Sequence, residues 1–269
     1  MIAAAKMRRA QQRVLASRPY ANKLVEFLGD LVARQSAGET SNLHPLMEVR
    51  EPSNIGVILV TPDRGLCGGL NANLIRAATR LSADQTAPVS WVSVGRKGRD
   101  FLTRNGREVK TEFTGLGDSP TPIDTAAIAT VALENFSAGV VDRVYLVFPE
   151  FVSVAIQRPV VQQLLPIQPP ETASEDGTPL PSDFEYEPDA ETVLGSLLPR
   201  YVEMLVHQAV LENIASEQTA RMVAMRNATE SAEEMIADLT LVYNKARQEA
   251  ITTELLDLVG GVAALEASS

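Results

Sequence analysis

Residues 55–71 read IGVILVTPDRGLCGGLN, and this stretch decides the fold of the chain. Its first part, residues 55–61, is a run of apolar and β-branched side chains, which is typical of a buried strand. Residues 63–69 supply the aspartate and glycines of a tight turn, and residues 70–81 have the apolar spacing of a helix. A strand, a turn and a helix in this order predict the beginning of an α/β domain.

The same alternation continues downstream of this unit. Strands are predicted at residues 89–94, 109–113 and 140–148, with helices at residues 96–105 and 123–136 between them. We therefore expect a parallel or mixed sheet with helices on both faces.

One more strand fits residues 154–167. Pro159 lies inside this segment and cannot donate a backbone hydrogen bond, which favours an edge position in the sheet.

The glycine turn at residues 65–69 has an alternative interpretation as a dinucleotide-binding loop, because it follows a strand and opens a helix. That site needs G-x-G-x-x-G and an acidic residue at the end of the second strand, whereas the second strand here ends in Gly95-Arg96-Lys97. We expect a structural turn without a bound cofactor. An NAD-linked oxidoreductase remains the competing hypothesis.

Both ends of the chain are predicted to be helical. Residues 1–35 are rich in helix-forming residues with apolar side chains at helical spacing, and Pro19 should bend this helix. Apolar residues recur at intervals of three and four after Asp189, a plausible N-cap, and Pro199 should start or kink this second helix. A helix over residues 199–265 would be about 100 Å long, which exceeds what a domain of this size can bury.

The two terminal helices are therefore expected to pair in an antiparallel coiled coil and to leave a surface for other subunits. Residues 169–188 lack periodicity and are rich in Pro, Glu, Asp, Ser and Thr, as in an exposed connection. The predicted parts are an N-terminal shaft helix at 1–35, a central α/β domain at 36–168, the connection with a foot region at 169–188, and a C-terminal shaft helix at 189–269.

Composition excludes several functional classes. The formal net charge of -10 argues against nucleic-acid binding, which needs clustered cations. The first segment is nevertheless basic, so an acidic protein partner is expected there. One cysteine and two histidines, without metal-ligand spacing, predict no disulfide and no metal site. The sequence contains no stretch of about 18 apolar residues, so no membrane span is predicted.

The motifs carry a resemblance to a known family. Residues 61–71, TPDRGLCGGLN, resemble the segment SDRGLCGGLN of the gamma subunit of bacterial rotary F-type ATP synthases. Four further strings resemble the C-terminal helix of that subunit: SEQ at 216–218, RMVAM at 221–225, DLTLVYNKARQ at 238–248 and ITTE at 251–254. The resemblance covers the centre and both ends of the chain.

The resemblance implies a non-catalytic rotor in the central stalk, with a long antiparallel coiled coil and a Rossmann-like α/β domain. Such a subunit couples rotation of the membrane c-ring, driven by proton flow, to conformational changes at catalytic sites on the beta subunits. The implied partners are the alpha and beta subunits of the hexamer, the epsilon subunit and the c-ring. The implied location is peripheral, on the cytoplasmic face of the bacterial membrane. No cofactor or small-molecule substrate is implied, and an unrelated coiled-coil scaffold is the remaining alternative.

The resemblance also assigns individual residues. The region that meets the catch loop of the beta subunit is matched by Arg247, Gln248, Thr252 and Glu254. The basic stretch near the acidic levers of the beta subunit is matched by Lys6, Arg8 and Arg9. The foot region is matched by Tyr186 and Glu187. Family members begin several helical turns before the position of Met1, so a short N-terminal helix is expected.

Overall fold

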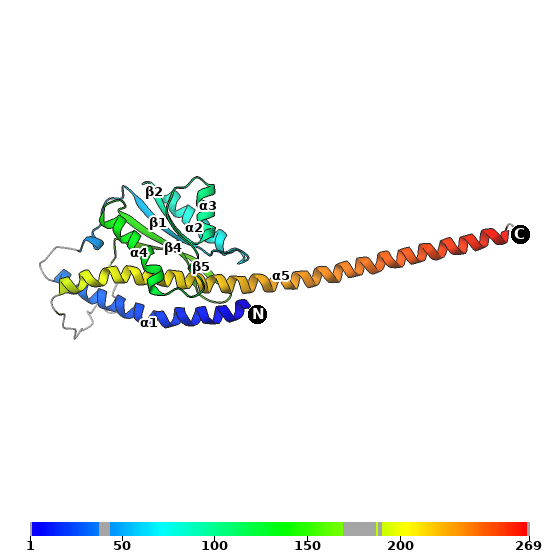
Figure 1. Cartoon of the computed structure of the whole chain (residues 1–269), viewed down its shortest axis with the longest axis horizontal. Helices are drawn as coiled ribbons and strands as arrows, with labels where there is room; N and C mark the ends of the chain where they lie inside the picture. The colour runs from blue at the N-terminus through cyan, green and yellow to red at the C-terminus, as the bar shows by residue number, and fades with distance from the viewer. Residues whose placement is uncertain (1, 38–43, 169–186, 188–189, 268–269) are drawn as a thin grey trace. The chain divides into compact units, whose positions relative to one another are not determined.

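The computed structural model of the chain describes residues 2–37, 44–168, 187 and 190–267. The chain divides into two compact units, Met1–Val223 and Ala224–Ser269. The first unit contains a five-stranded sheet with helices on both of its faces (Figure 1). The second unit is formed by the C-terminal part of one long helix, α5 (Ala190–Ala267), in which Pro199 is an internal residue. Asp189, the predicted N-cap, lies outside the described residues.

The sheet has the strand order β3-β2-β1-β4-β5. Its first four strands are parallel, whereas β5 is antiparallel to β4 at one edge. The sheet was expected to be parallel or mixed and is mixed, and the prediction that Pro159 lies on an edge strand is confirmed. The strands are β1 (Ile55–Val60), β2 (Val89–Val94), β3 (Val109–Phe113), β4 (Arg143–Phe151) and β5 (Gln157–Leu165).

Strand β5 is shorter than predicted, covering Gln157–Leu165 instead of 154–167, and β4 covers Arg143–Phe151 instead of 140–148. Strand β4 begins three residues later because Asp142 belongs to a turn, where its carboxylate accepts hydrogen bonds from the backbone N–H groups of Ser53 and Asn54. It extends to Phe151 because its pairing with β5 continues to the end of the hairpin. Apolar periodicity could not detect either effect, since both depend on partners distant in sequence.

Strand β1 alternates between two cores because successive side chains point to opposite faces of a sheet. Ile55, Val57 and Leu59 pack against the helices α2 (Leu70–Asp84) and α3 (Arg96–Arg104). Ile58 and Val60 belong to the larger core on the other face. Burial of the whole strand explains its continuous apolar sequence.

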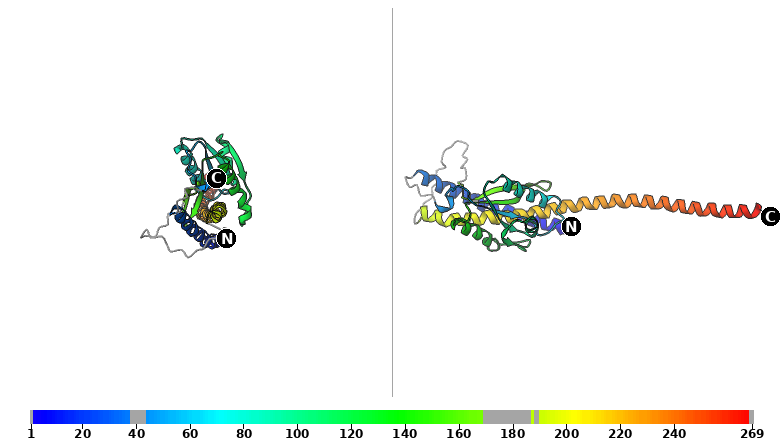
Figure 2. Two further views of the ribbon diagram at one scale, coloured as in Figure 1. Left: turned by 90° about the vertical axis from the view of Figure 1, so that its left-hand side faces the viewer. Right: turned by 90° about the horizontal axis from the view of Figure 1, so that it is seen from above.

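The larger core joins the sheet to three helices and a short 3-10 turn. These elements are α1 (Ile2–Ala37), α4 (Pro122–Ser137), the first part of α5, and η1 (Pro45–Met47). Within the first unit, α1 runs antiparallel to the first part of α5, and both views in Figure 2 place the two helices side by side. Val14 and Leu28 of α1 are buried in the same cluster as Leu198 and Val206 of α5. The predicted antiparallel helix pair beside an α/β domain is confirmed.

The second unit carries many exposed apolar side chains. Leu239, Val242 and Leu258 expose more than 60% of their surface. None of the described helices combines the length and the apolar composition that a membrane crossing needs.

Candidate subunit interface

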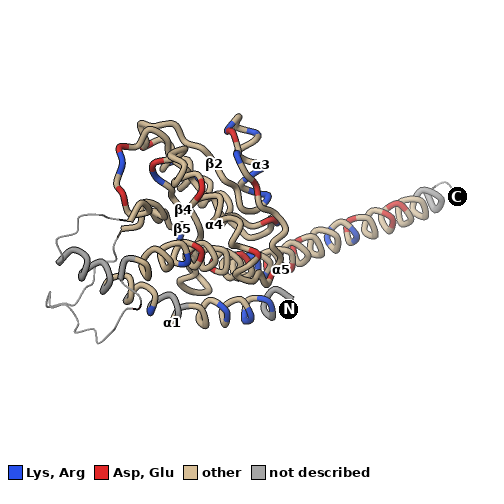
Figure 3. Tube along the Cα trace, turned by 60° about the vertical axis from the view of Figure 1, so that its left-hand side comes forward, with Lys and Arg blue, Asp and Glu red and all other residues tan. Residues whose placement is uncertain are grey.

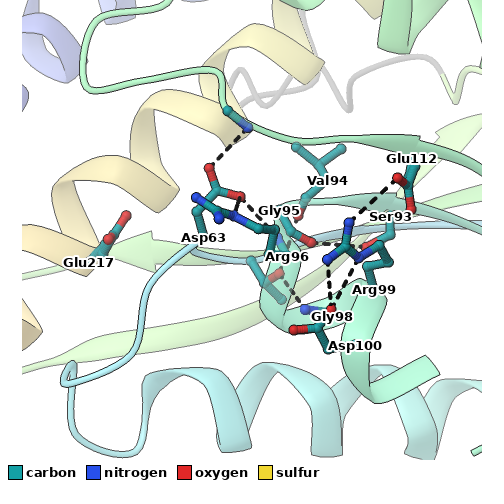
Figure 4. A network of polar contacts seen from close by, with 12 residues as sticks. Asp63, Ser93, Val94, Gly95, Arg96, Gly98, Arg99, Asp100, Glu112 and Glu217 are labelled. Atoms are coloured by element: carbon teal, nitrogen blue, oxygen red, sulfur yellow. Dashed lines mark hydrogen bonds and ion pairs between the residues drawn. The ribbon is translucent and has the colours of Figure 1, made fainter. Parts of the chain in front are cut away.

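The turn that follows β1 fastens the ends of the parallel strands together. The buried Thr61 hydroxyl donates a hydrogen bond to the Val94 carbonyl at 3.2 Å and accepts one from the Gly98 N–H at 2.8 Å. The Asp63 carboxylate accepts hydrogen bonds from the backbone N–H groups of Arg96 and Gly115, each at 3.0 Å (Figure 4). Asp63 therefore connects the end of β1 to the start of α3 and to the loop after β3, as a turn residue.

The glycine-rich part of the same turn packs against α5. Cys67 is buried beside Leu70, Leu74 and Ala220, and burial raises the pKa of its thiol, so the unreactive protonated form is favoured. Cys67 therefore acts as a small buried side chain in this contact. Arg221 of α5 donates a hydrogen bond to the Gly65 carbonyl at 3.2 Å. The turn thus joins α5 to the sheet.

A polar cavity of about 300 Å³ lies where the strand ends meet α1 and α5. Three ion pairs contribute to its lining: Lys6–Asp118, Arg96–Asp63 and Arg221–Glu217, with N–O distances of 2.6, 3.7 and 2.6 Å. Burial raises the pKa of Glu217, while the hydrogen bond and charge of Arg221 act in the opposite direction. The three cations already have carboxylate partners in the same chain. The geometry therefore favours a connection between the helices and the sheet.

The predicted interface residues fall into separate parts of the chain. Arg247, Gln248, Thr252 and Glu254 are exposed in the second unit, and the Thr252 hydroxyl donates a hydrogen bond to the Gln248 carbonyl at 2.8 Å. Their contact with a beta subunit stays a prediction.

On α1, Arg8 and Arg9 are exposed, and Figure 3 shows basic residues along the described part of this helix. Lys6 differs from them because it forms an ion pair with Asp118 of its own chain. Glu187 is exposed, whereas Tyr186 lies outside the described residues. The roles proposed for these residues stay predictions.

Two polar residues of α5 that sequence reasoning missed form hydrogen bonds with the end of strand β4, next to the turn of the β4–β5 hairpin. Glu212, which is 3% exposed, accepts a hydrogen bond from the Phe151 N–H at 2.9 Å. Ser216 donates one to the Pro149 carbonyl at 3.3 Å. The signal in the sequence was the occurrence of polar residues at helical positions that the apolar periodicity marks as buried.

The apolar residues of the second unit include two successive rows with helical spacing. Met235, Leu239 and Val242 follow a spacing of four and three residues, and the row continues to Ala246. The next row has the same spacing at Ile251, Leu255, Leu258 and Val262. Each residue of the second row lies sixteen positions after its counterpart in the first row, so the second row is rotated by about 160° around the helix. Large exposed apolar surfaces of this kind mark sites of protein interaction, here on more than one side of the helix.

Comparisons with known proteins give matches along nearly the whole chain. The family model described as ATP synthase matches residues 1–265. The ATP synthase gamma chain of Dehalococcoides mccartyi strain CBDB1 is 52% identical over 265 residues, covering 98% of this chain and 91% of the relative. The gamma chain of Herpetosiphon aurantiacus is 46% identical over 274 residues, with the same coverage of 98% and 91%.

Solved structures share the fold. A chain of the Euglena gracilis mitochondrial ATP synthase has a TM-score of 0.63 at 20% identity, covering 98% of this chain and 96% of that chain. A chain of the Tetrahymena thermophila mitochondrial central stalk and c-ring has a TM-score of 0.62 at 24% identity, covering 85% and 96%. The sequence motifs, the fold and the identity over 98% of the chain lead to one conclusion: this chain belongs to the ATP synthase gamma chain family.

Proposed function

We propose that this chain is the rotor subunit of the central stalk of a proton-translocating ATP synthase, peripheral to the cytoplasmic face of the bacterial membrane. Its partners are the alpha and beta subunits of the catalytic hexamer, the epsilon subunit and the c-ring. The observation that carries the proposal is the 52% identity to a gamma chain over 98% of this chain. The long helix with exposed apolar rows supports it, because such a surface fits inside a ring of other proteins.

The proposed mechanism is a shift in population at each catalytic site. A face of the rotor that contacts one state of a beta subunit better than another stabilises that state. Moving a site from 1:99 to 99:1 requires about 5.5 kcal/mol of differential interaction, whereas one exposed ion pair supplies at most about 1 kcal/mol. The coupling energy must therefore come from many contacts along the helix.

Co-purification tests the assignment. An affinity tag on this chain, expressed in its own host, should recover alpha, beta, epsilon and c subunits together with ATP hydrolysis from detergent-solubilised membranes. Mass spectrometry identifies the recovered chains. Recovery of the tagged chain without an ATPase hexamer would overturn the proposal and favour the scaffold alternative.

Distributed contacts lead to a prediction for Arg247. Replacing Arg247 with alanine should leave substantial ATP synthesis, because one exposed side chain contributes only a small part of the coupling energy. The rate is measured in energised membrane vesicles with equal amounts of assembled complex. Arg226→Ala is the matched control, an exposed arginine on the same helix outside the predicted set. Complete loss of synthesis in Arg247→Ala vesicles would contradict distributed coupling.

A further inference from the structure

Asp118, in the loop between β3 and α4, accepts hydrogen bonds from both long helices of the first unit. Lys6 of α1 donates to its carboxylate at 2.6 Å, and Gln218 of α5 donates to the other carboxylate oxygen at 3.4 Å. Arg13 of α1 donates to its backbone carbonyl at 2.8 Å. Lys6 and Arg13 are seven residues apart, which is about two helical turns, so they lie on one side of α1.

The loop that carries Asp118 is itself held to the sheet. Gly115 and Gly117 have φ angles of 77° and 76°, which glycine adopts without steric strain. The Gly115 N–H donates to the Asp63 carboxylate at 3.0 Å, so the turn after β1 fixes the loop. Hydrogen bonds to Asp118 therefore connect the sheet to two turns of α1 and to one position of α5.

The buried apolar faces of α1 and α5 already restrict the rotation of both helices, because turning either helix would expose residues such as Val14 and Leu198. Hydrogen bonds have preferred distances and angles, so the bonds to Asp118 add a directional restraint to this packing. Gln218 and Arg221 make their contacts within one turn of each other, in the last residues of α5 that belong to the first unit.

We propose that Asp118 is a positioning residue that adds to the restraint on rotation of α1 and α5 against the sheet, so that less torque is lost by slipping between the sheet and the helices. This inference rests on the proposed rotor function. Lys6 and Asp118 expose 40% and 51% of their side chains, and exposed ion pairs contribute little to folding stability. Because Asp118→Ala removes the side-chain contacts to both helices at once but leaves the apolar core intact, a partial loss of coupling is expected in a complex that still assembles.

The test compares two activities of the complete ATP synthase in the same membrane vesicles. In the Asp118→Ala variant, assembly and ATP hydrolysis should stay near wild type, while the number of protons pumped per ATP hydrolysed falls. Lys110→Ala is the matched control, since it removes the exposed ion pair with Glu108 at 2.7 Å, which involves neither helix. Its pumping ratio should equal that of the wild type.

Charge reversal separates positioning from a direct contact with another subunit. Lys6→Asp and Asp118→Lys should each lower the pumping ratio, and the double variant should restore it because the ion pair is rebuilt with opposite polarity. If Asp118→Ala does not assemble, Asp118→Asn keeps the shape and a hydrogen-bond acceptor while removing the charge, and a lowered ratio is expected there too.

Three results would overturn the inference: a wild-type ratio in the assembled Asp118 variants, a parallel loss of hydrolysis and pumping, or no rescue by charge reversal. Failure of the rotor assignment itself would be visible separately, because the wild-type chain would not co-purify with an ATPase hexamer.

Discussion

Replacing Gly95 with alanine is expected to prevent the sheet from forming its native register. A Cβ atom at this position would lie 1.9 Å from the Thr61 carbonyl oxygen, and the φ angle of 92° is rare for residues with a side chain. The neighbouring backbone cannot move away freely, since the Gly95 N–H donates to the Phe113 carbonyl at 2.7 Å and the Thr61 N–H donates to the Val94 carbonyl at 2.8 Å. The cost should exceed the about 1–3 kcal/mol of backbone strain alone.

Gly106→Ala is the matched control for this substitution. Gly106 has a φ of 65°, but nothing lies within 4 Å of a Cβ atom built there, so only the strain of the backbone conformation applies. The yield of soluble full-length chain and its thermal unfolding midpoint distinguish the two variants. Equal losses in both variants would show that the clash with Thr61 has no influence.

The strands could be predicted where turn residues flank the apolar runs on both sides. Residues 89–94 and 109–113 match β2 and β3 at both ends, and β2 is bounded by Pro88 and Gly95. These signals are local, so they can be interpreted without a structure. The bounds of β4 could not be predicted as well, because a turn with distant partners sets its start and hairpin pairing sets its end.

The candidate site was predictable to a smaller extent. The turn chemistry of Asp63 was evident from the sequence, but its donors belong to Arg96 and Gly115, which are 33 and 52 residues away. The pairing of Lys6 with Asp118 spans 112 residues and had no local signal. The roles of Arg247, Gln248, Thr252 and Glu254 depend on chains outside this one, so only resemblance to the family could suggest them.

Arg221→Ala is expected to produce the second large loss of stability, with a characteristic dependence on pH. Arg221 and Glu217 expose only 19% and 12% of their side chains, and their N–O distance is 2.6 Å. Removing the arginine leaves a largely buried carboxylate without its cation and the Gly65 carbonyl without a donor. Loss of one partner from a buried pair costs several kcal/mol, so about 2–4 kcal/mol is expected near neutral pH.

The sign of the pH dependence follows from Glu217. Its pKa is raised in the native state by burial, and without Arg221 it should rise further, since the arginine lowers it. A raised folded pKa gives stability that is fully present below the unfolded pKa of about 4.3 and is lost as pH rises through the folded pKa. The variant should therefore differ least from the wild type near pH 4 and most above the raised pKa of Glu217.

Denaturant unfolding at a series of pH values measures this difference. Adding Glu217→Gln to both proteins should remove the pH-dependent part and leave the constant loss of the bond to Gly65. Arg226→Ala is the matched control, because Arg226 and Glu230 have the same spacing of four residues on α5 but expose 80% and 59% of their side chains. Its effect should stay below about 1 kcal/mol at every pH. A stability difference for Arg221→Ala that grew towards acid pH would contradict the role of Glu217, because protonation should relieve its unpaired charge.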